Sequence, residues 1–93
     1  MANESKDSVI LVGKKNTKSY VLAVITLLNQ GIKNITLKAR GKSISTAVDV
    51  AEMVRNKFAK DLKVEAINIS TEELTNEDGT KVRVSAIEIK LLK

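Results

Sequence analysis

Apolar and polar positions follow strand-like and helix-like spacings in turn along the first half of the chain. Residues 8–13 form a short apolar run ending at Gly13, which predicts a strand covered on both faces, as in the middle of a sheet. A helix with one apolar stripe follows, and either Asn16 or Thr17 is suited to cap it. Residues 32–39 then alternate apolar and polar, which is typical of a strand with one buried face. The stripe of the helix comprises Tyr20, Val21, Val24, Leu27 and Leu28.

A second helix is predicted from about Ser45 to Lys60, because apolar residues recur there at spacings of three and four. Met53 lies on the opposite side of this helix and Val50 lies toward its flank. These two residues are either harmless exposed side chains or part of a second contact surface. The core stripe comprises Ile44, Ala47, Val48, Ala51, Val54 and Phe58.

The C-terminal third of the chain predicts two long strands, at about 63–75 and 81–93, joined by a turn at Gly79. Both strands change hydrophobic phase midway, which indicates a β-bulge or a change of surroundings along the strand. The stretch 70–83 is mostly polar and cannot cover a core. We therefore expect it to project as an arm.

The resulting element order is β-α-β-α-β-β. Right-handed crossovers place both helices on one face of a mixed four-stranded sheet. The predicted fold class is therefore α+β, a two-layer sandwich with a protruding β-hairpin arm. A length of 93 residues suits a single domain, at 8–93, preceded by a polar tail at 1–7 that we expect to be disordered.

The composition excludes several kinds of chemistry. The chain has no Cys and no His, which rules out a zinc finger, a thiol nucleophile and a histidine general base. The paired carboxylates, Glu72-Glu73 and Glu77-Asp78, fall in the solvated arm, where nothing raises a pKa for acid catalysis. We therefore expect no enzyme, no cofactor and no metal. The longest apolar run has four residues, so we expect neither a membrane span nor a signal peptide, and a location inside the cell.

Positive charge is concentrated in one part of the chain. The net charge is +5, yet residues 14–42 hold seven basic residues and no acid. Since two parallel strands end at the same edge of a sheet, the clusters that follow them become neighbours. Gly13 and Gly41 would let backbone N–H groups approach a phosphate oxygen there. The clusters are Lys14 with Lys15, Lys18 in the first helical turn, and Lys38, Arg40 and Lys42.

These clusters predict a phosphate-binding edge, and the alternative is a solvated basic face kept for solubility. The two aromatic residues, Tyr20 and Phe58, both fall on core stripes, so no stacking platform for single strands is expected. Contacts should therefore go mainly to the backbone of a duplex.

The stretch from SVILVGKK through KARGK to VRNKF, together with the ending RVSAIEIKL, resembles the Alba family of archaeal chromatin proteins. The resemblance covers about residues 8–93. It implies an Alba-like fold and a cytoplasmic, chromosome-associated homodimer that coats and compacts double-stranded DNA, and also RNA, with little sequence preference. It also implies a basic body that grips phosphates and two hairpin arms that reach the flanking minor grooves.

The resemblance implies roles for individual residues. Lys14 matches an acetylated position whose modification lowers affinity, and Arg83 falls on the arm. Arg55 and Phe58 match a dimer–dimer contact used in cooperative coating. Asn16 stands where the family usually has a proline, so we expect a more mobile loop there. The residues matched to the binding surface of the body are Lys14, Lys15, Lys38, Arg40 and Lys42.

Several alternatives stay open at this point. The chain could be an RNA-binding scaffold subunit of an RNA-processing particle, or an interaction module with an incidental basic face. Arg83 could pair across the hairpin with Glu72 or Glu73 instead of meeting a groove. Phe58 could be buried in the core of its own subunit.

Overall fold

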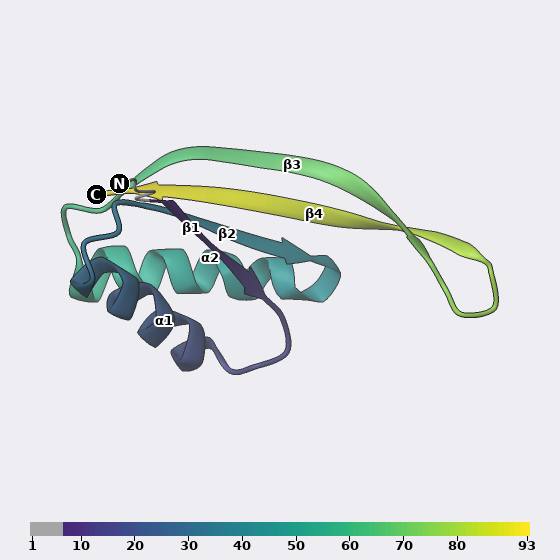
Figure 1. The fold of residues 1–93 in the computed structure, drawn as a ribbon, viewed down its shortest axis with the longest axis horizontal. Coiled ribbons are helices and arrows are strands. Elements are labelled where there is room, and N and C mark those ends of the chain that lie inside the picture. Colours follow the sequence, from purple (N-terminus) through teal and green to yellow (C-terminus); the bar gives the residue numbers. More distant parts are fainter. Residues whose placement is uncertain (1–6) are drawn as a thin grey trace, which may run out of the picture.

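The computed structural model describes residues 7–93, which form a four-stranded sheet with two helices packed against one of its faces (Figure 1). The predicted α+β class, element order and projecting arm are confirmed. A short 3₁₀ turn, Gly41–Ser43, precedes the second helix, and a π-helical turn, Val54–Phe58, extends it. The other elements are β1 (Asp7–Val12), α1 (Thr17–Asn29), β2 (Asn34–Arg40), α2 (Ile44–Met53), β3 (Lys63–Thr75) and β4 (Lys81–Leu92).

The strand order is β1-β2-β4-β3, with β1 parallel to β2 and the other pairs antiparallel. The prediction that residues 8–13 form a central, doubly covered strand is wrong, because β1 lies at the edge of the sheet. Its outward face is uncovered, and Leu11 is 74% exposed. Asp7, which we assigned to the disordered tail, pairs with Asn34 as the first residue of β1, while residues 1–6 lie outside the described part.

The core lies between the helices and the covered face of the sheet. In α2 and the π-helical turn that extends it, the buried residues are Ala47, Val50, Ala51 and Val54, at helical spacings of three, one and three. Val50 is 0% exposed and Val48 is exposed, so our assignment of these two residues was reversed. The hydrophobic periodicity is compatible with a helix that buries Val48 and with one that buries Val50. Contact with β2 and β4 selected the rotation that buries Val50.

The hairpin of β3 and β4 extends beyond the helices (Figure 1). A register shift between Val64 and Ala66 is the bulge that the phase change of the first strand predicted. β4 pairs with β2 without a shift, and its phase change reflects different surroundings along the strand. Gly79, with φ of 89°, closes the turn as expected. Within residues 7–93, no helix has the length and apolar character needed to cross a membrane.

Candidate nucleic-acid interface

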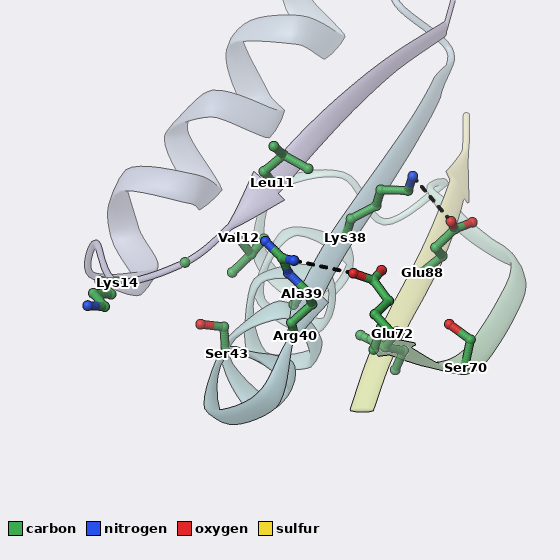
Figure 2. Close-up of a pocket in the computed structure, with 13 residues that line it drawn as sticks. Leu11, Val12, Lys14, Lys38, Ala39, Arg40, Ser43, Ser70, Glu72 and Glu88 are labelled. Atoms are coloured by element: carbon green, nitrogen blue, oxygen red, sulfur yellow. Dashed lines mark hydrogen bonds and ion pairs between the residues drawn. The ribbon is translucent and has the colours of Figure 1, made fainter. Parts of the chain in front are cut away.

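The carboxyl ends of β1 and β2 bring the two basic clusters together. Val12 lies opposite Ala39 in the parallel register, so the loop after β1 adjoins the turn after β2. The sharp turn into α2 begins at Gly41, whose φ of 55° suits a residue without a Cβ. An open groove of about 460 Å³ lies across this edge (Figure 2). Its basic residues are Lys14, Lys38 and Arg40.

The loop that carries Lys14 is tied down from α1. The hydroxyl oxygen of Tyr20 accepts hydrogen bonds from the backbone N–H groups of Gly13, at 2.8 Å, and Lys15, at 3.1 Å. Asn16 is the helix cap, and its Oδ1 accepts a hydrogen bond from the N–H of Ser19 at 3.0 Å. The expected role of the Gly13 N–H as a phosphate ligand is therefore corrected, because Tyr20 already occupies it.

Two acids line the groove beside the basic residues. Lys38 Nζ lies 3.4 Å from Glu88 Oε2, and Arg40 Nη1 lies 3.3 Å from Glu72 Oε1 (Figure 2). All four side chains are about half-exposed. Sequence reasoning missed both acids as parts of this site. The signal for Glu88 was the register of β2 and β4, which places it directly opposite Lys38.

The remaining predicted binding residues surround the groove or lie on the arm. Lys15, Lys18 and Lys42 are exposed near the same edge, in the loop, in the first turn of α1 and in the 3₁₀ turn. Arg83 lies on the arm, opposite Glu73 in the register. Glu73 pairs instead with Lys81, at 3.6 Å, and Glu72 pairs with Arg40, so the alternative pairing of Arg83 with either acid is absent within residues 7–93.

The acidic tip of the arm is partly engaged in its own turn. Asp78 Oδ1 accepts hydrogen bonds from the hydroxyl of Thr80, at 2.6 Å, and from its backbone N–H, at 2.9 Å. These bonds, the side-chain one first, hold the pKa of Asp78 below its usual value. The carboxylate therefore serves the turn as an acceptor.

The residues assigned to the dimer–dimer contact lie on the π-helical turn, outside the groove. Phe58 is 59% exposed, so the alternative that it belongs to its own core is wrong. Arg55 pairs with Glu52 through Nη1, while its buried Nε has no hydrogen-bond partner within the described residues. This end of the helix therefore has an exposed aromatic ring, and a buried donor without a partner among the described residues.

Comparison with known proteins places this arrangement in a family. The sequence model of the Alba family matches residues 8–71. The chain is 54% identical over 86 residues to the DNA/RNA-binding protein Alba of Methanocella arvoryzae, covering 92% of this chain and 90% of that protein. Among solved structures, Alba from Thermoplasma volcanium superposes with a TM-score of 0.86 at 53% identity, covering 91% of this chain and 99% of its own. ALBA1 from Trypanosoma brucei superposes with a TM-score of 0.70 at 27% identity, covering 98% and 72%.

The match with the family model spans more than half of the chain, and the fold agrees with that of Alba from Thermoplasma volcanium. The chain belongs to the Alba family.

Proposed function

We propose that this chain is a homodimeric chromatin protein that binds double-stranded DNA, and also RNA, with little sequence preference, and coats and compacts it. The observation that carries the proposal is the meeting of Lys14, Lys38 and Arg40 at one sheet edge. The name of the relative from Methanocella arvoryzae, a DNA/RNA-binding protein, supports the same function. The role is one of binding, with no catalysis, no cofactor and no metal.

Lysine and arginine at this edge bind phosphates of the duplex. Phosphate contacts fix the position of a protein on a duplex but carry no sequence information directly. Lys14, Lys15 and Lys42 lie in loops and turns, Lys38 and Arg40 lie on β2, and Lys18 lies in the first turn of α1, so the basic residues do not form one row along a helix. This supports sequence-tolerant binding. Acetylation of Lys14 would remove one of these charges and lower the affinity.

The arm supplies a second contact. Arg83 lies on β4 of the hairpin, opposite Glu73 of β3, and no acid forms an ion pair with it within residues 7–93. In the proposed complex this guanidinium reaches a minor groove that flanks the body, where negative potential attracts arginine. The acids at the tip keep the outermost residues away from the phosphates.

An apolar surface supports the homodimer. Ile69 of β3 is 81% exposed, and Ile67 is exposed beside it. In the strand register, Ile69 lies opposite Ile87 and Ile67 lies opposite Ile89, and both partners are buried. Ile67 and Ile69 therefore extend the apolar surface of the core to the edge strand β3, where it is exposed. A small domain gains stability by burying such an edge against a second copy. Arg55 and Phe58 remain outside this surface for contacts between dimers along the duplex.

Salt dependence tests the proposed binding. Neutralising about 4–6 phosphates should give a slope of roughly −4 to −5 for log affinity against log salt. Fluorescence anisotropy with several unrelated duplexes of equal length measures this slope and the sequence preference together. A flat response, or strong selection of one short sequence, would contradict the proposal and favour an interaction module with an incidental basic face.

The second candidate is an RNA-binding scaffold subunit, which the words "DNA/RNA-binding" in the name of the relative also support. Competition between labelled duplex DNA and structured RNA in one assay separates the two functions. Preference for the RNA by more than about tenfold, or 1.4 kcal/mol, would favour the scaffold. Comparable affinities, or preference for DNA, would favour the chromatin protein. We propose that such a protein lies in the cytoplasm, associated with the chromosome.

A further inference from the structure

Two carboxylates already pair with two of the three cations that a phosphate would meet in the groove. Glu88 of β4 lies against Lys38, and Glu72 of β3 lies against Arg40, both within salt-bridge distance (Figure 2). The two acids come from the strands that continue into the arm, whereas both cations come from β2. The groove therefore contains its own anions, supplied by the neighbouring strands β4 and β3 of the same sheet.

The geometry makes these pairs replaceable. Both lie at a half-exposed surface, where water competes with each partner and an ion pair is weakly held. A carboxylate and a phosphate offer the same type of oxygen acceptor to lysine and arginine. A phosphate that enters the groove therefore competes directly with Glu72 and Glu88 for their cations.

We propose that Glu72 and Glu88 are built-in competitors that weaken nucleic-acid binding, an inference that rests on the proposed function. Each phosphate contact at Lys38 or Arg40 competes with an internal ion pair for the same charged group. The released carboxylate then remains near the phosphate and repels it. The two acids keep the binding surface weak enough to exchange along a duplex.

Glu72 has an additional effect, because it links the arm to the body. It lies at the base of the arm on β3, and its partner Arg40 lies two strands away on β2. Arg40 of β2 and Ser70 of β3 both lie opposite Ala86 of β4 in the strand register. Glu72 lies two residues beyond Ser70, so its ion pair with Arg40 crosses β4. When a phosphate takes Arg40, the tie between arm and body opens.

The experiment compares single substitutions that change the charge equally. Glu72→Gln and Glu88→Gln remove the two competitors, and Glu73→Gln is the matched control. Glu73 is the neighbour of Glu72 in sequence, but it pairs with Lys81 and lies outside the groove. Affinity for one short duplex is measured by anisotropy at low and at physiological salt, and melting curves confirm that each variant folds.

We expect Glu72→Gln and Glu88→Gln each to tighten binding about two- to five-fold more than Glu73→Gln does. The gain should be larger at low salt, because repulsion between carboxylate and phosphate is less screened there. Weaker binding by Glu72→Gln or Glu88→Gln would show that the acids position the cations, and would overturn the proposal. A gain equal to that of Glu73→Gln would overturn it too, since only net charge would then matter.

Failure of the proposed function looks different in the same experiment. If the wild-type chain and all variants do not bind the duplex, both proposals fall. If the wild-type chain binds with the expected salt slope and the variants match the control, only the competitor proposal fails. A measurement on the wild-type protein keeps the proposal testable even if a variant does not fold. In NMR spectra, the side-chain Nε–Hε signal of Arg40 should shift on addition of inorganic pyrophosphate. An unchanged signal at saturating duplex and pyrophosphate would also contradict the proposal.

Discussion

The hydroxyl oxygen of Tyr20 lies 2.8 Å from the backbone nitrogen of Gly13 and accepts its hydrogen. The same oxygen accepts the N–H of Lys15, so one buried side chain of α1 holds both sides of Lys14. This contact, together with the cap that Asn16 forms on α1, holds the loop in place. It also links the packing of the core to the position of Lys14, the first of the lysines proposed to bind phosphate.

Removing this hydroxyl tests the link. Tyr20→Phe leaves two N–H groups without their acceptor, which should cost about 1–3 kcal/mol of stability and weaken duplex binding several-fold. Amide hydrogen exchange at Gly13 and Lys15 should become faster. Thr26→Val, which removes an exposed hydroxyl from the same helix, is the control and should change neither quantity. If the effects of Tyr20→Phe and Lys14→Gln on affinity simply add, the loop does not position that lysine.

Lys14 carries the most direct prediction for the body. Lys14→Gln removes one charge, as acetylation does, and should weaken binding to all duplex sequences alike and reduce the salt slope by about 1. Lys60→Gln removes an equal charge outside the groove and should leave the slope unchanged. A salt titration of both variants decides the matter, and equal slopes would show that Lys14 does not contact a phosphate.

The contribution of the arm depends on Arg83. Arg83→Gln should reduce affinity by about 1–3 kcal/mol if the guanidinium enters a groove of the duplex. Lys81→Gln is the matched control on the same strand, where the lysine already pairs with Glu73. Replacing Asn76–Thr80 with a shorter turn should leave the dimer intact and also reduce affinity. Anisotropy with duplexes longer than the body makes the comparison, and an unchanged affinity for Arg83→Gln would make the hairpin a passive extension.

Phe58 tests assembly along the duplex. Because its ring is exposed, Phe58→Ala should barely lower the melting temperature, whereas a buried phenylalanine would cost about 3–5 kcal/mol. The same change should abolish cooperative binding to long duplexes and keep the dimer. Leu22→Ala, at an exposed position of α1, is the control. Binding that stays equally cooperative in gel-shift titrations would remove Phe58 from the dimer–dimer contact.

The exposed edge of β3 tests the dimer itself. Ile69→Lys places a charge in the apolar surface that we expect a second copy to cover, so the variant should sediment as a monomer. Val9→Lys adds the same charge to the outward face of β1 and should remain dimeric. Analytical ultracentrifugation measures both. A dimeric Ile69→Lys would mean that the copies meet elsewhere.

Local patterns along the chain were sufficient to predict the elements and their order. The spacing of Tyr20, Val21 and Val24 identified α1, and Gly79 identified the turn of the hairpin, because these signals depend on residues a few positions apart. The basic edge was also predictable. Lys14 follows β1 and Arg40 ends β2, and topology alone brings the ends of two parallel strands together.

Only the tertiary structure decided which residues occupy each surface. The rotation of α2 on the sheet buried Val50 and exposed Val48, and the edge position of β1 uncovered Leu11. The pairing of Arg40 with Glu72 joins residues 32 positions apart in sequence, across an intervening strand. Such contacts depend on strand register and on packing between distant segments, which local periodicity does not specify. The sequence by itself therefore determined the elements and the basic edge, and tertiary packing decided which cations of that edge carry an internal partner.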